Sequence, residues 1–263
     1  MNDYPYLYMN PYRNPYVHSG YRSHAAARQN RYILDKQIGD VNGDSIPDIV
    51  YLVGEKNEKP FYEKIKVIVQ DGKTRLWYVI PLDSQYSMAY TPWLILASFA
   101  NVNRNEIMVN LPVGGSGALT YYYVISFLNN QAEYILGPEQ FMNLSDTLGF
   151  EVIYLDHYRV LVKSETLNQS YTLDISARKE VYEGSVYDKD GKLIKPQEGF
   201  VIDLPHLYPI KIDGSVPYKL EAQHDIAGTS HADRLGSIVL YWKYKGDNQS
   251  WVLDPKMFFV TLQ

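Results

Sequence analysis

The stretch that decides the fold is DVNGDSIPD at residues 40–48, followed by IVYLVG at residues 49–54. The second part is rich in β-branched and aromatic residues and closes with glycine, which predicts a β-strand. The first part carries oxygen-bearing side chains at its first, third, fifth and ninth positions, namely Asp40, Asn42, Asp44 and Asp48. Ca²⁺ is a hard cation that prefers oxygen ligands. We therefore predict a calcium loop between two strands, with the backbone carbonyl of Ile46 as a further ligand.

The loop does not fit a helix-loop-helix calcium site. An EF-hand loop carries Gly at its sixth position and Glu at its twelfth, where this chain has Ser45 and Tyr51. Over residues 39–53 the pattern resembles the FG-GAP or VCBS-type repeat of integrin-like β-propellers, in which such a loop recurs once per blade. The resemblance implies a calcium-stabilised binding or scaffold module.

Two further segments carry parts of the same pattern. FANVNRNEIMV at residues 99–109 parallels the first loop but is shorter and has lost most of its acids. Its amides and Arg104 offer little negative charge, so an Asn-rich turn is favoured over a metal site between Asn101 and Glu106. The sequence Asp188-Lys189-Asp190-Gly191 favours a hairpin turn over a set of metal ligands.

From Tyr32 onward the apolar runs are short and are bounded by Gly, Asn, Asp or Pro, which predicts an all-β fold. Strands are expected near residues 31–36, 49–53, 64–69, 76–80, 94–99, 106–111, 119–128, 132–136, 150–155, 159–163, 169–175, 181–186, 200–203, 218–223, 237–244 and 257–261. Taken in fours they give a β-propeller-like repeat of four-stranded antiparallel units, open or incomplete. No amphipathic stretch predicts a helix of adequate length.

The expected organisation has three parts. Residues 1–30 form an arm, residues 31–194 an FG-GAP-like β-repeat body, and residues 195–263 an atypical C-terminal β-repeat or small β-domain. The arm is predicted to be disordered because it has almost no aliphatic residues. Its tyrosines alternate with Asn, Pro and Arg, at Tyr4, Tyr6, Tyr8, Tyr12, Tyr16 and Tyr21. It could mediate assembly by stacking and cation–π contacts, or be a solvated leader without a role.

Composition limits the function classes. The chain has 263 residues, a net charge of −5 and no cysteine, which excludes disulfides, thiolate metal sites and cysteine nucleophiles. The acidic balance argues against nucleic-acid binding. The N-terminus lacks the charged and apolar regions of a secretory signal, and no run approaches the length of a membrane span. The expectation is therefore cytoplasmic synthesis without membrane insertion, with a spore coat or the cell surface as the proposed address.

Two segments contain residue types used in catalysis. Gly114-Gly115-Ser116-Gly117 fits neither a nucleophile elbow nor a phosphate loop, so a wide turn is favoured. A second segment combines histidines and carboxylates, as in a hydrolase triad or a divalent-metal site, at His224, Asp225, His231 and Asp233. The spacing across Ala227-Gly228-Thr229 is typical of a loop, so these residues are candidates for an interaction loop.

The tryptophans Trp77, Trp93, Trp242 and Trp251 could line a stacking surface or pack inside the body. Taken together, the sequence favours a non-enzymatic, calcium-stabilised structural or interaction module whose partner is a protein or a glycan. Two alternatives stay open. One is a β-propeller hydrolase or lyase acting on carbohydrate through His224, His231 and Asp233. The other is a carbohydrate-binding surface protein.

Overall fold

The computed structural model describes residues 30–56, 58–100, 103–115, 119–202, 206–214, 216–246 and 250–262. The described chain is all-β, as predicted, and its strands form four antiparallel sheets. The predicted N-terminal arm lies outside the described residues, apart from Asn30.

The first two sheets are four-stranded, and consecutive strands pair with each other in both. The first sheet contains β1 (Arg31–Gly39), β2 (Asp48–Glu55), β3 (Glu63–Gln70) and β4 (Trp77–Pro81). The second sheet contains β5 (Trp93–Ala97), β6 (Glu106–Gly114), β7 (Leu119–Ser126) and β8 (Glu133–Leu136). These are the four-stranded antiparallel units expected from the sequence.

The remaining strands form two sheets of different size. The third sheet has the order β11-β10-β9, with β9 at Phe150–Leu155, β10 at Arg159–Ser164 and β11 at Gln169–Asp174. The fourth sheet is built on β14 (Lys219–Ala227), which pairs with β15 (Arg234–Lys245), and β15 pairs with β16 (Ser250–Leu262). The short strands β12 (Phe200–Val201) and β13 (His206–Ile210) both pair with β14, at opposite ends of that strand.

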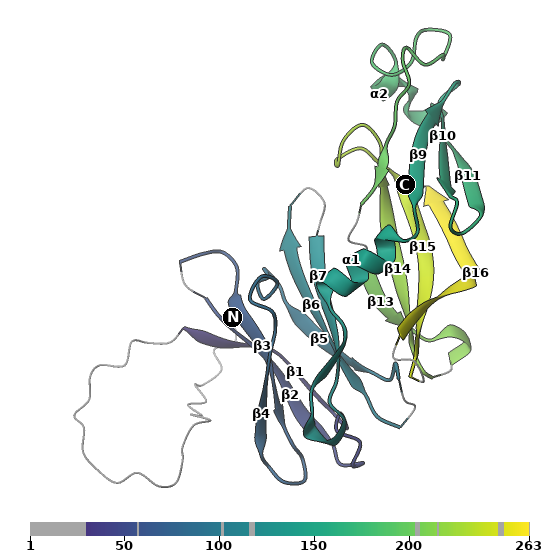
Figure 1. Cartoon of the computed structure of the whole chain (residues 1–263). Helices are drawn as coiled ribbons and strands as arrows, with labels where there is room; N and C mark the ends of the chain where they lie inside the picture. The colour runs from purple at the N-terminus through teal and green to yellow at the C-terminus, as the bar shows by residue number, and fades with distance from the viewer. Residues whose placement is uncertain are drawn as a thin grey trace.

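The second sheet lies between the first and the fourth sheets (Figure 1). Along β6 the side chains alternate between two hydrophobic clusters. Ile107, Val109 and Leu111 belong to the cluster shared with the first sheet, whereas Met108 belongs to the cluster shared with the third and fourth sheets. Strand side chains alternate between the two faces of a sheet. Since both faces of this sheet are packed, β6 is buried from Glu106 through Leu111. The second sheet is therefore a central layer with apolar packing on both faces.

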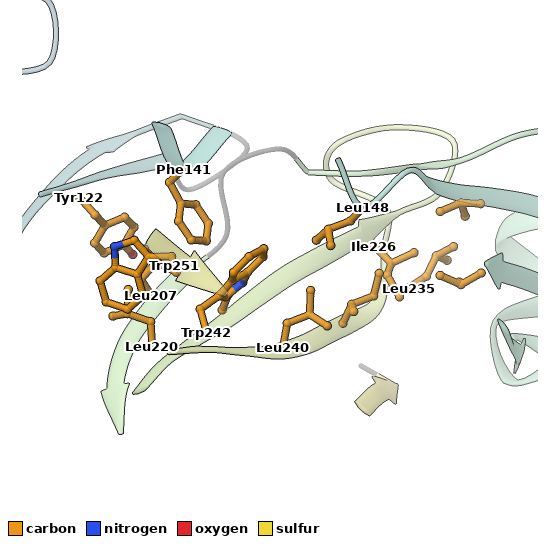
Figure 2. Close-up of a cluster of buried hydrophobic side chains, with 14 of the residues drawn as sticks. Tyr122, Phe141, Leu148, Leu207, Leu220, Ile226, Leu235, Leu240, Trp242 and Trp251 are labelled. Atoms are coloured by element: carbon orange, nitrogen blue, oxygen red, sulfur yellow. The ribbon is translucent and has the colours of Figure 1, made fainter. Parts of the chain in front are cut away.

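The larger cluster, between the second and fourth sheets, contains two tryptophans (Figure 2). Trp242 packs its ring 6.0 Å from that of Phe141. The indole Nε1 of Trp251 donates a 2.8 Å hydrogen bond to the carbonyl of Ile135 on β8. Residues from both sides of position 195 join this cluster, so apolar packing is continuous across the boundary expected there.

A nine-residue helix, α1 (Pro138–Asp146), was not expected from the sequence. It begins with Pro138 at its first turn and buries Phe141 in the larger cluster, between the second and fourth sheets in Figure 1. None of the helices in the described ranges is long and apolar enough to cross a membrane.

The strand predicted at residues 181–186 is wrong. The 3₁₀ helix η2 (Ser176–Arg178) and the short helix α2 (Lys179–Tyr182) lead into this segment, which then continues through turns. Tyr182 is buried and its hydroxyl donates to Asp233 at 2.6 Å. This contact, together with the positive φ of 81° at Gly184, turns the backbone away from an extended path. The other 3₁₀ turns are η1 (Leu128–Asn130) and η3 (Ile212–Gly214).

Candidate functional site

The Asp/Asn loop lies between β1 and β2, as predicted, and its side-chain oxygens accept hydrogen bonds from the loop's own backbone. Asp40 accepts from Gly43 N at 2.7 Å and from Ser45 N at 2.9 Å. Asn42 Oδ1 accepts from Asp44 N at 3.0 Å, and Asp44 Oδ1 accepts from Ile46 N at 2.9 Å. These Asx-type bonds stabilise a tight turn, which also contains φ values of 87° at Gly43 and 67° at Ser45.

The ninth position, Asp48, closes the loop. It is fully buried and uses both carboxylate oxygens: Oδ2 accepts from Val41 N at 3.0 Å and Asn42 N at 3.3 Å, and Oδ1 accepts from Gly72 N at 2.9 Å. Burial raises the pKa of Asp48, and these backbone hydrogen bonds oppose the rise. Asp48 thus ties the loop to its own strand and to the turn between β3 and β4.

The arrangement of these oxygens does not form a calcium cage. Across the described residues, no three Asp, Glu or His side chains come together in a group that could hold a metal ion. Asp48 in particular is directed at backbone amides rather than at Asp40 and Asp44. Calcium binding by Asp40, Asn42, Asp44, Ile46 and Asp48 stays a prediction that requires these groups to rearrange.

The second loop contains a carboxylate that plays the same part. Glu106, at the start of β6, is fully buried, and its Oε2 accepts from Phe99 N at 2.7 Å and from Ala100 N at 3.0 Å. Its Oε1 lies 3.0 Å from Nη1 of Arg104. Burial raises the pKa of Glu106, while the backbone amides and Arg104 lower it. Asn101 and Val102 lie outside the described residues.

The two loops also contact each other. Asn105 N donates to the carbonyl of Asp40 at 2.9 Å, and Asn129 N donates to the carbonyl of Asn42 at 3.0 Å. The side chain of Asn130 then links Asn42 to Asp71, with hydrogen bonds of 3.1 Å and 2.9 Å. The Asp/Asn loop therefore joins the first sheet to the second.

The predicted interaction loop is dispersed over different surroundings. On β14, His224 is buried whereas the next residue, Asp225, lies on the opposite face, where it pairs with Arg234 and accepts from Ser237 Oγ at 3.0 Å. His231 is exposed and packs its ring 4.7 Å from Phe200. The structure thus does not bring His224, His231 and Asp233 together as a triad.

Asp233 is the centre of a buried hydrogen-bond network. It accepts from the Tyr182 hydroxyl at 2.6 Å, from Arg178 Nη2 at 2.8 Å and from Thr229 N at 3.0 Å. Burial opposes the ionisation of Asp233, but the Tyr182, Thr229 and Arg178 contacts outweigh it and hold the pKa below its usual value. These bonds anchor α2 to the loop between β14 and β15, which is a structural role.

Two other loops carry turn chemistry. Asp188 Oδ1 accepts from Asp190 N at 2.9 Å and Lys192 N at 2.8 Å, and Gly191 has a φ of 74°. In the glycine segment, Gly114 and Gly115 have φ values of 75° and 89°, while residues 116–118 lie outside the described chain.

His224 lines a cavity of about 390 Å³ between α1, β9, the segment 198–202 and β14. Its Nε2 has no hydrogen-bond partner among the described residues, and neither has the Oγ of Ser145 in the same cavity. Burial lowers the pKa of His224 to about 4, so the imidazole is neutral at pH 7. Sequence reasoning grouped His224 with His231 because they are close in the chain, and it missed the cavity, whose walls come from distant segments.

The tryptophans divide between the core and the surface. Trp242 and Trp251 are buried in the larger cluster, whereas Trp77 and Trp93 are partly exposed. The ring of Trp77 on β4 stacks on Tyr51 of β2 with centroids 5.8 Å apart and an interplanar angle of 28°. Lys36 Nζ lies 5.7 Å from the centre of the Tyr51 ring.

These rings belong to an apolar outer face of the first sheet, on the side away from the core. The strand register places its members next to one another across the sheet, and they are Ile33, Ile38, Ile49, Tyr51, Val53, Ile68, Trp77 and Val79. Ile38 is 63% exposed and Ile33 54% exposed. Charged residues on the same face are Arg31, Lys36, Glu55, Glu63 and Lys66, together with Lys64, which pairs with Glu55. We call this surface the outer face.

Comparison with known proteins gives a family match. The family model described as the YybI C-terminal domain matches residues 148–258, which include β9 and β14 beside the His224 cavity. The uncharacterized protein YybI of Bacillus subtilis (strain 168) is 34% identical over 218 residues, covering 82% of this chain and 81% of that protein. These matches overturn the resemblance to FG-GAP or VCBS-type repeats, which was inferred from about fifteen residues around the Asp/Asn loop. The chain belongs to the YybI family.

Proposed function

We propose that this chain is a non-enzymatic structural protein that associates with further copies of itself through the outer face of its first sheet. The observation that carries the proposal is the apolar character of this face, on which Ile33, Ile38, Trp77 and Val79 are exposed. A large apolar patch on a protein surface is typical of an interaction site, and here eight apolar side chains are adjacent in the strand register.

Charge supports a second copy as the occupant. The outer face carries four basic side chains and two acidic side chains, Glu55 and Glu63. The whole chain has more acidic than basic side chains, 30 against 25. A second copy is therefore acidic on balance, and complementary charge favours its approach to this face. Two outer faces placed against each other would bring like charges together.

The location of the face determines the kind of assembly. The first sheet is at one end of the stack of sheets (Figure 1). Contact between this face and a different surface of the next copy is heterologous, and such contacts form rings or open arrays. An open array suits the proposed role as a structural protein of a spore coat or a cell surface. Fractionation of cells with an antibody against the chain tests that address.

Sedimentation velocity tests the association. At about 100 µM protein, roughly a hundred times a micromolar Kd, the wild type is expected to sediment as a mixture of copies. Ile38→Glu places a charge on the most exposed side chain of the patch and is expected to give a monomer, as is the double variant Lys36→Glu with Lys66→Glu. The matched control is Val181→Glu, because Val181 is 61% exposed on α2. A wild type that stays monomeric, or a control that dissociates as completely as Ile38→Glu, would reject the proposal.

The stack of Trp77 on Tyr51 favours one second candidate, a carbohydrate-binding surface protein, since aromatic faces stack on apolar ligand surfaces. Binding to a glycan array that is lost in Trp77→Ala, with a monomeric wild type, would support this candidate instead. Calcium stabilisation through Asp40, Asn42, Asp44, Ile46 and Asp48 is a separate part of the proposal, supported by the density of oxygen-bearing side chains in the loop.

A further inference from the structure

The cavity beside His224 is built by three parts of the chain, which are residues 145–153, residues 198–202 and His224 on β14. The end of α1 contributes Ser145 and Asp146, the start of β9 contributes Phe150 and Glu151, and the chain at residues 198–202 contributes the opposite wall. Its volume of about 390 Å³ is within the range of small-molecule sites.

Two buried polar atoms in this cavity lack a partner among the described residues. They are Nε2 of His224, a residue 1% exposed, and Oγ of Ser145, a residue 8% exposed. A buried polar group without a hydrogen bond costs about 1–3 kcal/mol. A bound group that supplies the missing hydrogen bonds would remove this cost.

The hydrogen bonding of the imidazole determines what Nε2 can do. The ring is hydrogen-bonded to the backbone of Ile202 through its other nitrogen, Nδ1. The Ile202 N–H already donates to the carbonyl of Asp225, so the carbonyl of Ile202 is left as the acceptor and Nδ1 carries the proton. In a neutral imidazole with Nδ1 protonated, Nε2 is an acceptor. The cavity therefore presents an acceptor at its buried wall.

The charge of the cavity selects for cations. Three acidic residues, Asp146, Glu151 and Glu198, are among its lining residues and are exposed, and none of its described lining residues is Lys or Arg. Glu151 is paired with Lys163 at 3.0 Å, whereas Asp146 and Glu198 form no ion pair within the described part of the chain. The phenyl rings of Phe150 and Phe200 complete the lining, and aromatic faces attract cations.

We propose that this cavity binds a small primary ammonium ion, which donates hydrogen bonds to Nε2 of His224 and Oγ of Ser145. The carboxylates of Asp146 and Glu198 balance its charge, and the phenyl rings contact its alkyl chain. A metal ion fits less well, because no group of three Asp, Glu or His side chains in the described chain converges as a metal site would require. The proposal is independent of self-association through the outer face.

Isothermal titration calorimetry with four probes tests the chemistry of the site. The probes are butylamine, 1,4-diaminobutane, 1-butanol and butyrate, which share a chain length and differ in charge and in donors. Saturable binding is expected for the amines, with affinities at least tenfold above those for the alcohol and for butyrate. The absence of saturable binding would show that only water fills the cavity. Equal binding of the alcohol and the amines would show that the ammonium group is not recognised. Either result would overturn the proposal.

Variants test the residues. His224→Leu and Ser145→Ala should each weaken amine binding about tenfold or more, since a hydrogen bond to a charged group contributes roughly 1.5–3 kcal/mol. Ser145→Ala also serves if His224→Leu does not fold. The matched control is His157→Asn, which changes an exposed histidine outside the lining and should bind as the wild type does.

The ¹⁵N resonance of His224 Nε2 gives a second readout, because it reports directly on a donor reaching this atom. It should shift on addition of butylamine and not of butyrate. Unchanged amine affinity in both cavity variants would place the ligand elsewhere. Displacement of the amine by Zn²⁺ alone, with the same shift at Nε2, would assign the site to a metal ion and overturn the proposal.

Discussion

Lowering the pH from 7 to 5 should destabilise this protein through one buried residue, His224. Burial lowers the pKa of His224 to about 4 in the folded chain, while an unfolded histidine has a pKa of about 6.5. The unfolded state therefore binds the proton first. Stability is fully present above the unfolded pKa and is lost as the pH falls from about 6.5 toward 4.

The size of the effect follows from the two pKa values. At pH 5 the unfolded imidazole is almost fully protonated and the folded one is mostly neutral, which corresponds to a loss of roughly 2 kcal/mol of unfolding free energy relative to pH 7. Continued acidification to pH 4 would bring the loss to about 3 kcal/mol. A typical total stability is about 5–15 kcal/mol, so the change is large enough to measure.

Urea unfolding at pH 7 and pH 5 measures this loss, and His224→Gln provides the reference. The acidic residues beside the cavity, Asp146, Glu151 and Glu198, are present in both proteins, so the comparison isolates the imidazole. The loss between pH 7 and pH 5 should be about 2 kcal/mol larger in the wild type than in the variant. His231→Gln, which removes an exposed histidine, should retain the wild-type difference.

Equal losses in the wild type and in His224→Gln would refute the reasoning, because the buried imidazole would then contribute nothing to acid sensitivity. If the variant does not fold, direct NMR titration of His224 decides the same question. A folded-state pKa near that of a free histidine would contradict the burial of this ring.

Three further predictions concern the Asp/Asn loop. Asp48→Asn replaces one of two accepting oxygens with an amino group, so it should lower the unfolding free energy by about 1–3 kcal/mol in EDTA. Asp44→Asn should cause a smaller loss, because the Asp44 side chain is only half-buried. Equal losses in the two variants would contradict the closing role of Asp48. Gly72→Ala should lower the Tm, because a Cβ at this position would meet the backbone of Pro47. The control Gly246→Ala should leave the Tm unchanged, since a Cβ there meets nothing within 4 Å. An unchanged Tm in Gly72→Ala would contradict this packing. If the loop binds calcium, the Tm should be higher in Ca²⁺ than in EDTA, and this difference should be lost in Asp44→Ala. Coincident melting curves of the wild type in Ca²⁺ and in EDTA would reject calcium binding.

Most strands of this protein were predictable because their signals are local, but β13 and the first half of β16 were not expected. Alternating apolar side chains bounded by turn residues gave β2, β3, β6 and β9 nearly at their observed limits. The helix α1 was not predictable in this way, since its nine residues bury few apolar side chains and give little helical periodicity. The available signal was Pro138 following Gly137, which is typical of a helix start.

The error at residues 181–186 shows where tertiary contacts override local preference. Val181, Tyr182 and Val186 favour a strand by residue type. The hydroxyl of Tyr182 instead reaches Asp233, more than fifty residues later in the chain. The His224 cavity could not be predicted for the same reason, because α1 and β9 contribute Ser145 and Phe150 from segments far from β14.

The Asp/Asn loop shows why residue types alone do not identify a metal site. A carboxylate that can bind Ca²⁺ can equally accept backbone N–H groups, and the two roles select the same residues in a tight turn. The two loops of this chain distinguish the roles. The second loop has asparagine where the first loop has Asp40 and Asp44. Its Glu106 still accepts from two backbone amides, as Asp48 does in the first loop. The feature common to both units is therefore the carboxylate that closes the turn at the start of the second strand by accepting backbone N–H groups.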